Sequence, residues 1–223
     1  MDISFGRRLI WGGMYQYNQT WTLPIDIDNI YHPIRNCSAS NLSGITFDAG
    51  STGAVASVAA GPTGYITVTS TAHGLLNGEI VFLTNSTDYD GQFIVANKTD
   101  NTFDVLETYN VTRTCNWYQP STLKVPVGGA GMYRLAYSMT ADGAANGKNF
   151  KSELAFGSGT TVTHIDYSAC ERLFSTGSDY CVLTSSCFQQ LAEGDYVFLQ
   201  IKNTTDNTDL IVRHCNINMV VLG

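Results

Sequence analysis

Short runs in which hydrophobic and polar residues alternate dominate the chain. Residues 133–139 read YRLAYSM, so apolar side chains take every second position. Residues 150–156 likewise place Phe150, Leu154 and Phe156 opposite Lys151 and Glu153. Successive side chains of a strand point to opposite faces, so each run predicts a strand with one face in the core. A helical period is nearly absent, and Gly and Asn interrupt any window long enough for three helical turns. The pattern predicts an all-β chain.

Residues 70–109 carry turn signals at even spacing. Dipeptides that tolerate the backbone of tight turns separate short runs rich in β-branched and aromatic residues. The three dipeptides are Asn77-Gly78, Asp90-Gly91 and Asp100-Asn101, and the runs that they separate are Ile80–Leu83, Phe93–Val95 and Phe103–Leu106. This stretch therefore predicts a small all-β module.

One predicted strand is apolar on both faces. Within residues 194–203 (GDYVFLQIKN), Tyr196 and Phe198 alternate with Val197, Leu199 and Ile201. A strand buried on both sides in a small all-β domain suggests that one sheet face meets another subunit. We therefore expect a homo-oligomer, with trimer contacts at Tyr137, Tyr196 and Phe198.

Composition excludes several classes of partner. The formal net charge is −7, and the 12 Lys and Arg residues form no basic stripe, which disfavours nucleic-acid binding. No segment approaches the ~20 apolar residues of a membrane span, and the first residues lack the pattern of a signal peptide. We expect a protein made in a host cytoplasm, with its six cysteines as buried free thiols.

The first 33 residues differ in composition from the rest of the chain. Aromatic and basic residues stand among Gly and Asn without clear periodicity. Trp, Tyr and Arg are enriched at interface anchors, so one interpretation is an extended anchoring arm. The residues expected to anchor it are Phe5, Arg7, Arg8, Trp11 and Trp21. The alternative is that this segment packs on its own body.

Candidate chemistry is sparse. His164 and Asp166 lie two apart on a presumed strand, which would place both on one face, but an exposed polar strand end explains them equally well. The pairs Asp26/Asp28 and Asp88/Asp90 lack the further ligands of a calcium loop. We expect no catalytic, cofactor-binding or metal residues, and a protein that is not an enzyme.

The central stretch resembles a small β module of phage tail and other virion proteins, which is also found in ubiquitin-activating enzymes. The matching segments are Val68-Thr69, Ala72-His73-Gly74-Leu75, Gly78-Glu79-Ile80-Val81, Tyr89-Asp90-Gly91-Gln92-Phe93 and Asp100-Asn101-Thr102-Phe103. Glu79 departs from the more common Asp. The resemblance covers about a fifth of the chain and implies an accessory building block in a virion, with a structural role for His73.

The last hundred residues look like the trimeric jelly rolls of the tumour-necrosis-factor and complement globular-head type. The segments that carry this likeness are VPVGGAGMYRLAYSM, LAEGDYVFLQIKN and NINMVVLG. Similar folds recur in phage fibres, decoration proteins and lectin-like tips. The likeness implies a jelly-roll sandwich that assembles as a homotrimer.

These observations predict four segments. Residues 1–33 form the arm, 34–60 supply the first jelly-roll strands, 61–108 form a β-barrel-like module, inserted or in tandem, and 109–223 form the jelly roll. The expected function is a non-enzymatic phage virion protein, a trimeric capsid decoration or head fibre that contacts other virion proteins. The alternative is a tail-tip or receptor-binding protein that holds a host surface glycan against Tyr167 or Tyr180. A third, weaker alternative is a glycan-cleaving enzyme.

Overall fold

The structure is a computed structural model that describes residues 10–17, 21–23, 29–143, 146–159, 161–175 and 180–222. Its regular elements are β-strands and one 3₁₀ turn, η1 (Asp166–Ser168). Within these ranges, no helix has the length and apolar character needed to cross a membrane. The all-β prediction is confirmed.

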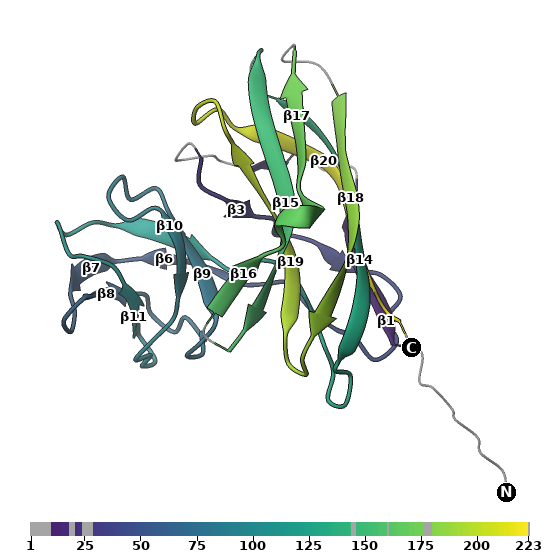
Figure 1. The fold of residues 1–223 in the computed structure, drawn as a ribbon. Coiled ribbons are helices and arrows are strands. Elements are labelled where there is room, and N and C mark those ends of the chain that lie inside the picture. Colours follow the sequence, from purple (N-terminus) through teal and green to yellow (C-terminus); the bar gives the residue numbers. More distant parts are fainter. Residues whose placement is uncertain are drawn as a thin grey trace, which may run out of the picture.

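Two antiparallel sheets form the larger part of the molecule (Figure 1). Sheet A has the order β18-β14-β20-β1-β4, with β2 also paired to β20. Its strands are β1 (Trp11–Gln16), β2 (Trp21–Leu23), β4 (Ser38–Ala39), β14 (Gly131–Gly143), β18 (Tyr180–Leu191) and β20 (Leu210–Val221). Sheet B has the order β16-β15-β19-β13-β5, with β17 paired to β15 and β3 to β19. Its strands are β3 (His32–Pro33), β5 (Thr46–Asp48), β13 (Thr122–Lys124), β15 (Lys148–Ser158), β16 (Thr161–His164), β17 (Cys170–Phe174) and β19 (Tyr196–Asn203).

The connections between these sheets are those of a jelly roll. The chain passes from β13 in sheet B to β14 in sheet A and back to β15, and it changes sheet again at β18, β19 and β20. Several strands that follow one another along the chain, namely β13 to β15 and β17 to β20, therefore lie in alternate sheets, and β14 pairs with the distant strand β20. The fold is a jelly-roll sandwich.

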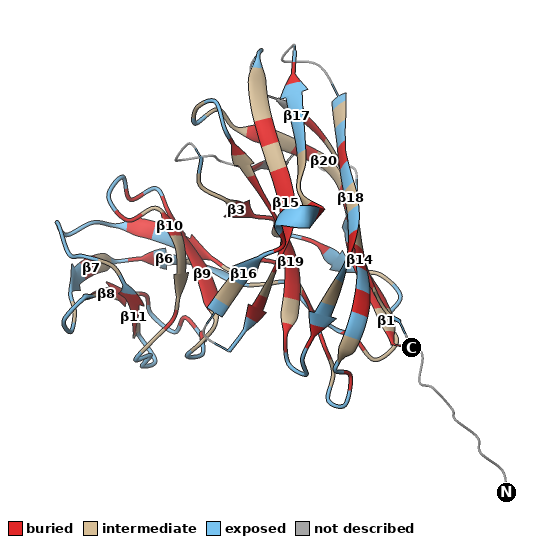
Figure 2. Cartoon of the chain, viewed as in Figure 1, coloured by how far each residue is buried: buried red, intermediate tan, exposed pale blue. Residues whose placement is uncertain are grey.

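The alternating pattern of the sequence places the core between the sheets. Tyr133, Leu135, Tyr137 and Met139 of β14 are buried, whereas Arg134 and Ser138 are exposed, as predicted (Figure 2). Across the sandwich, β19 contributes Val197, Leu199 and Ile201 to the same hydrophobic cluster.

A smaller unit lies beside the sandwich. One of its sheets has the order β10-β9-β12-β6 and the other β11-β8-β7, and both are open sheets on a shared core. The strands are β6 (Thr52–Val55), β7 (Ser57–Ala60), β8 (Tyr65–Thr69), β9 (Ile80–Thr84), β10 (Gly91–Ile94), β11 (Thr102–Leu106) and β12 (Cys115–Tyr118). We call residues 52–118 the module. The Asp90-Gly91 turn joins the paired strands β9 and β10, but β11 pairs with β8 and not with β10.

His73 has the structural part in the module that the resemblance implies. Its Nδ1 accepts a hydrogen bond of 3.0 Å from the backbone N–H of Leu75, and its Nε2 lies 3.2 Å from the carbonyl oxygen of Thr102. The ring therefore ties the His-Gly-Leu turn to β11.

The module interrupts a hairpin of the sandwich. The sandwich strands β5 and β13 pair with each other. β6 follows β5 along the chain and β12 precedes β13, and these two module strands also pair with each other. A backbone hydrogen bond of 2.8 Å from Gln119 to Ser51 continues this ladder between the two units. Residues 52–60 and 115–118 thus lie in module sheets, whereas the sequence analysis grouped them with the jelly roll. The wider division into segments stays a prediction.

The described part of the N-terminal segment packs on the sandwich. β1 pairs with β20 from Gly12 to Gln16, and Met14 and Tyr15 also pair with β4. Gly13 allows the close approach to β20, because a Cβ there would lie within 2.9 Å of Asn218 and Ile217. Residues 10–17 thus pack on the body of the same chain, and the anchoring role of the segment stays a prediction.

The outer face of β19 is covered from within the same chain. Phe198 is fully buried and clusters with Ile80 of the module and with Ala155 of β15. We call these three residues the junction cluster. The two-sided apolar pattern of β19 therefore reflects contact with the inserted module, and the oligomer that we inferred from this strand needs another basis.

Candidate functional site

The three residues predicted to form trimer contacts are placed within one protomer. Tyr137 is 2% exposed, and its hydroxyl lies 2.8 Å from the Ser152 hydroxyl inside the sandwich. Phe198 has no exposed area, and Tyr196 is half-buried beside it, with ring centroids 6.4 Å apart. Residues with 2% or less of their area exposed have almost no surface for contact with a second chain, so the assignment of Tyr137 and Phe198 to a trimer interface is wrong.

The predicted anchoring residues fall mostly outside the described structure. Phe5, Arg7 and Arg8 lie outside the described residues, as does the side chain of Trp21. Trp11 is half-buried at the start of β1, where its backbone N–H donates to the carbonyl oxygen of Ser43 at 3.0 Å. Anchoring by this segment stays a prediction.

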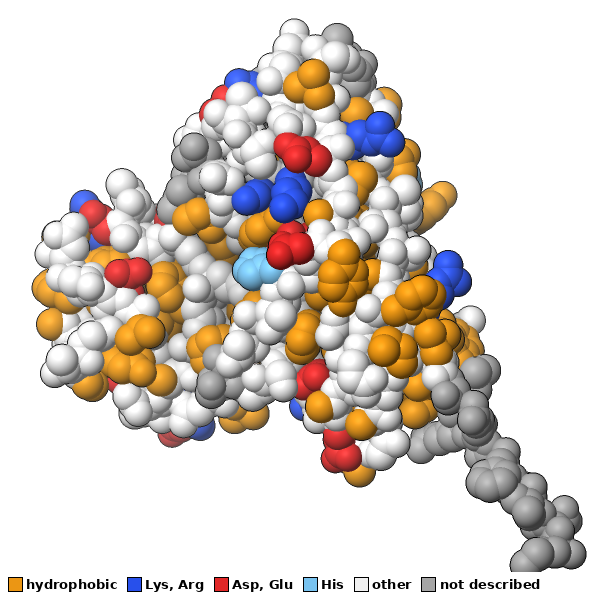
Figure 3. Space-filling model, in the orientation of Figure 1, with side chains coloured by type: hydrophobic (Ala, Val, Ile, Leu, Met, Phe, Trp, Pro, Cys, Tyr) orange, Lys and Arg blue, Asp and Glu red, His pale blue; other side chains and the backbone are white. Residues whose placement is uncertain are grey.

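The outer face of sheet A is largely exposed, with Tyr17 packed on His214 at one part of it. Ser138 lies near its centre, between Thr184 of β18 and Asn216 of β20. Hydrophobic side chains surround this polar centre, and Phe188 is 59% exposed and Val182 48% exposed. We call the outward side chains of β14, β18 and β20, together with Tyr15, the open face. Figure 3 shows hydrophobic side chains gathered along the edge where β14 and β18 run.

The open face belongs to a sheet with few charges. The strands of sheet A contain three residues that are charged at neutral pH, Arg134, Asp142 and Arg213. Arg213 and Asp142 neutralise each other through two hydrogen bonds of 3.0 and 2.7 Å. The strands of sheet B contain eight, namely Asp48, Lys124, Lys148, Lys151, Glu153, Glu171, Arg172 and Lys202. The two faces of the sandwich thus differ in chemistry.

A buried carboxylate organises the opposite side of the sandwich. Glu153 of β15 has no exposed area and accepts hydrogen bonds from the Tyr31 hydroxyl at 2.6 Å and from Gln200 Nε2 at 3.0 Å. His164 Nδ1 lies 2.6 Å from the same carboxylate. Burial by itself would raise the pKa of Glu153, but these hydrogen bonds outweigh it and hold the pKa below its usual range.

In this polar cluster the Glu153 carboxylate is closed to solvent, whereas the His164 side chain is 45% exposed. The cluster joins the segment before β3 to β15, β16 and β19, and no part of its carboxylate is accessible to a substrate. The predicted pairing of His164 with Asp166 on one strand face is not present, because β16 ends at His164 and Asp166 begins the turn η1. The partner that sequence reasoning missed, Glu153, lies eleven positions earlier on a neighbouring strand. Figure 3 shows histidine, acidic and basic side chains gathered over β15 and β16.

The described residues contain no cluster of three or more His, Cys, Asp or Glu side chains suited to a metal. Asp88 instead pairs with Arg113 at 2.5 Å, and Asp90 accepts a hydrogen bond of 2.7 Å from the Ser86 backbone. Asp26 and Asp28 lie outside the described residues. The six cysteines are free thiols.

Comparisons with solved structures find jelly-roll proteins at low similarity. Murine APRIL aligns with 77% of this chain and 100% of its own, at 13% identity and a TM-score of 0.36. The globular domain of zebrafish complement 1qA aligns with 65% of this chain and 96% of its own, at 14% identity and a TM-score of 0.32. Eiger TNF from S. frugiperda aligns with 77% of this chain and 93% of its own, at 9% identity and a TM-score of 0.34. With scores this low, the jelly-roll assignment rests on the strand order of the two sheets.

No protein-family model matches the sequence, and no curated protein matches it.

Proposed function

We propose that this chain is a non-enzymatic structural protein of a phage virion, a homotrimeric capsid decoration or head fibre whose copies meet through the open face of sheet A. The observation that carries the trimer is the nearly neutral, largely exposed face described above. The virion role is supported by the resemblance of the module to building blocks of phage tail proteins, and the number three by the resemblance to trimeric jelly rolls.

A neutral face suits contact between identical copies. In a homo-oligomer the same residues recur around one symmetry axis, so an uncompensated charge close to that axis meets its own copies. On the open face, Arg134 is the charged residue without a salt bridge, and Ser, Thr and Asn side chains can pair across the contact. The exposed Phe188 and Val182 would be buried by the same contact. The protomer therefore presents hydrophobic area around a polar centre that needs no counter-charge.

The other sheet has less surface to offer. The module covers the outer face of β19 through the junction cluster, and Tyr31 bonds to Glu153 over β15. Assembly through sheet A also leaves the module free to project from the trimer. There it could meet a neighbouring virion protein without interfering with subunit contacts.

The N-terminal residues provide the attachment in this proposal. β1 holds the start of the described chain on sheet A, and Phe5, Arg7 and Arg8 precede β1 by a few residues in the sequence. Three neighbouring copies of one short segment would bind a multivalent surface with far higher avidity than a single copy.

Light scattering on the purified protein tests the assembly. We expect a mass of three times 24.3 kDa. Ser138→Glu places a charge at the centre of the open face and should shift the mass toward one protomer. Ser158→Glu makes the same change at an exposed serine of β15 in sheet B and should keep the trimer. A wild-type monomer, or equal behaviour of the two variants, would overturn the proposed contact.

Attachment needs a separate experiment. Deleting residues 2–22 would remove β1 and damage sheet A, so the suitable variant replaces Phe5, Arg7 and Arg8 with alanine. We expect this variant to stay trimeric and to lose co-sedimentation with virions that lack the wild-type protein. Unchanged co-sedimentation would contradict the anchoring role alone.

A further inference from the structure

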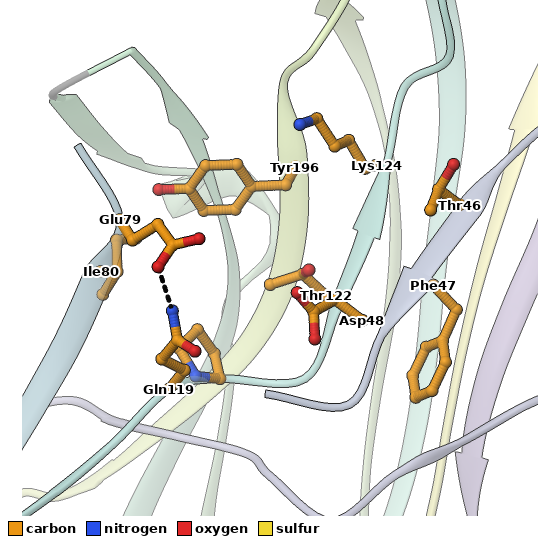
Figure 4. A pocket seen from close by; sticks show the side chains of 10 residues that line it. Thr46, Phe47, Asp48, Glu79, Ile80, Gln119, Thr122, Lys124 and Tyr196 are labelled. Atoms are coloured by element: carbon orange, nitrogen blue, oxygen red, sulfur yellow. Dashed lines mark hydrogen bonds between the residues drawn. The ribbon is translucent and has the colours of Figure 1, made fainter. Parts of the chain in front are cut away.

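A cleft lies where the module meets the sandwich (Figure 4). Its volume is about 300 Å³, at the lower end of the range for small-molecule sites. Asp48, Thr122 and Lys124 come from the hairpin β5–β13, Tyr196 from β19, and Glu79 from the residue before β9 of the module. The cleft therefore exists only because the module is inserted here.

The junction holds the walls of the cleft in place. Tyr196 lies over Gly157 of β15, where an added Cβ would come within 2.1 Å of the ring. The absence of a side chain at Gly157 is therefore what allows the ring to occupy this position. Ile80, which lines the cleft, is itself 2% exposed and packs against Phe198 in the junction cluster. The aromatic wall is thus fixed before any ligand arrives.

The polar groups are held in place and are only partly used. Glu79 accepts hydrogen bonds through Oε2, from the Leu76 backbone at 2.9 Å and from Gln119 Nε2 at 3.0 Å. Asp48 accepts one through Oδ1, from the Gly50 backbone at 2.8 Å. Within the described structure, the second oxygen of each carboxylate has no hydrogen bond. These bonds orient both carboxylates and leave an acceptor on each.

Two donors in the cleft also lack partners among the described residues. The Tyr196 hydroxyl is a buried atom without a hydrogen bond. Burial and the carboxylates of Glu79 and Asp195 raise the pKa of Tyr196, so its hydroxyl stays protonated. Lys124 lines the cleft and forms no salt bridge with a described residue. The site therefore combines free acceptors with free donors around an aromatic ring.

We propose that this cleft binds a saccharide, with the ring of Tyr196 against one face of the sugar and Glu79, Asp48 and Lys124 on its hydroxyl groups. Each sugar hydroxyl both donates and accepts, so one ligand can satisfy the carboxylates and the ammonium together. An anion would meet two carboxylates, and a simple cation would leave Lys124 unused. The apolar C–H face of a pyranose suits an aromatic wall. This inference goes beyond the proposed assembly role and does not depend on the trimer.

Saturation-transfer NMR on the full chain tests the site. The probes are glucose, galactose, N-acetylglucosamine and their β1,4-linked dimers, at concentrations on the order of 10 mM, where even millimolar affinity is visible. We expect transfer to the ring protons of at least one probe. No transfer to any of the six would overturn the proposal.

Matched variants locate the binding. Glu79→Gln should reduce transfer at least about fivefold, because the amide loses one acceptor and carries no charge. Glu193→Gln is the control, since Glu193 likewise accepts a backbone hydrogen bond, of 2.9 Å from Gly128, and does not line the cleft. Tyr196→Phe removes only the hydroxyl and should give an intermediate loss. Equal transfer in Glu79→Gln and Glu193→Gln, with both variants folded by circular dichroism, would also overturn the proposal.

Discussion

Phe198 offers a direct test of the interpretation that the module, and not a second subunit, buries the outer face of β19. Its side chain has no exposed area in the protomer. Replacing a buried Phe with Ala costs about 3–5 kcal/mol of the free energy of unfolding. The junction cluster is small and the module can move toward the vacated space, so we expect about 3 kcal/mol for Phe198→Ala. In a chain of this size, that corresponds to a fall in Tm of about 6–12 °C.

The assay is urea unfolding followed by tryptophan fluorescence, at one fixed protomer concentration for all variants, because association would otherwise change the apparent stability. Phe188→Ala is the control: it makes the same chemical change at a side chain that is 59% exposed on the open face. We expect it to alter protomer stability by less than about 0.5 kcal/mol and to weaken assembly. If Phe198→Ala left stability unchanged and lowered only the mass in solution, the junction would be wrong and the original trimer assignment restored.

Three further predictions follow from the contacts described above. The pKa of Glu153 is lowered in the folded protein. The ionised carboxylate therefore stabilises the fold fully above the ordinary pKa of glutamate, and this stabilisation is lost as the pH falls through the folded-state pKa. Between pH 7 and pH 3, the urea midpoint should therefore fall less in Glu153→Gln than in the wild type. Gly157→Ala forces the Tyr196 ring to move and should cost about 1–3 kcal/mol in urea unfolding while reducing saccharide transfer. Without reductant, Ellman's reagent should detect six thiols in denaturant. In the native state at pH 8, Cys115 and Cys187 should stay unmodified, because burial raises the pKa of Cys115 to about 12 and that of Cys187 to about 11. Fast labelling of either thiol would contradict this burial.

The local pattern of the sequence identified elements well and their partners less well. The alternation around Tyr137 correctly predicted which face of β14 is buried, because a strand that borders a core must alternate. The same reasoning failed for β19, since periodicity records that a face is buried but not what buries it. Glu153 was expected on a polar face and is fully buried, and one of its partners, Tyr31, lies 122 positions away in the sequence. Such long-range pairings leave no local signal.

The cleft was also beyond sequence reasoning. Asp48 and Glu79 are both acidic residues near turns, and in sequence they are indistinguishable from solvated aspartates and glutamates elsewhere. Their proximity arises only when the module folds back against the hairpin β5–β13. The resemblance of the module to virion building blocks predicted its strands and the structural role of His73. It did not predict which surface the module shares with the jelly-roll sandwich.

The ladder that links the two units has a consequence for how the chain folds. β5 and β13 must pair across residues 49–121. Closing so long a loop costs conformational entropy before any contact within the sandwich offsets that cost. If β6 and β12 pair first, only residues 49–51 and 119–121 separate the two sandwich strands. We therefore expect the module to fold early and to serve as an internal nucleus for the jelly roll. A flexible linker of equal length in its place should slow refolding, whereas a two-residue turn should not.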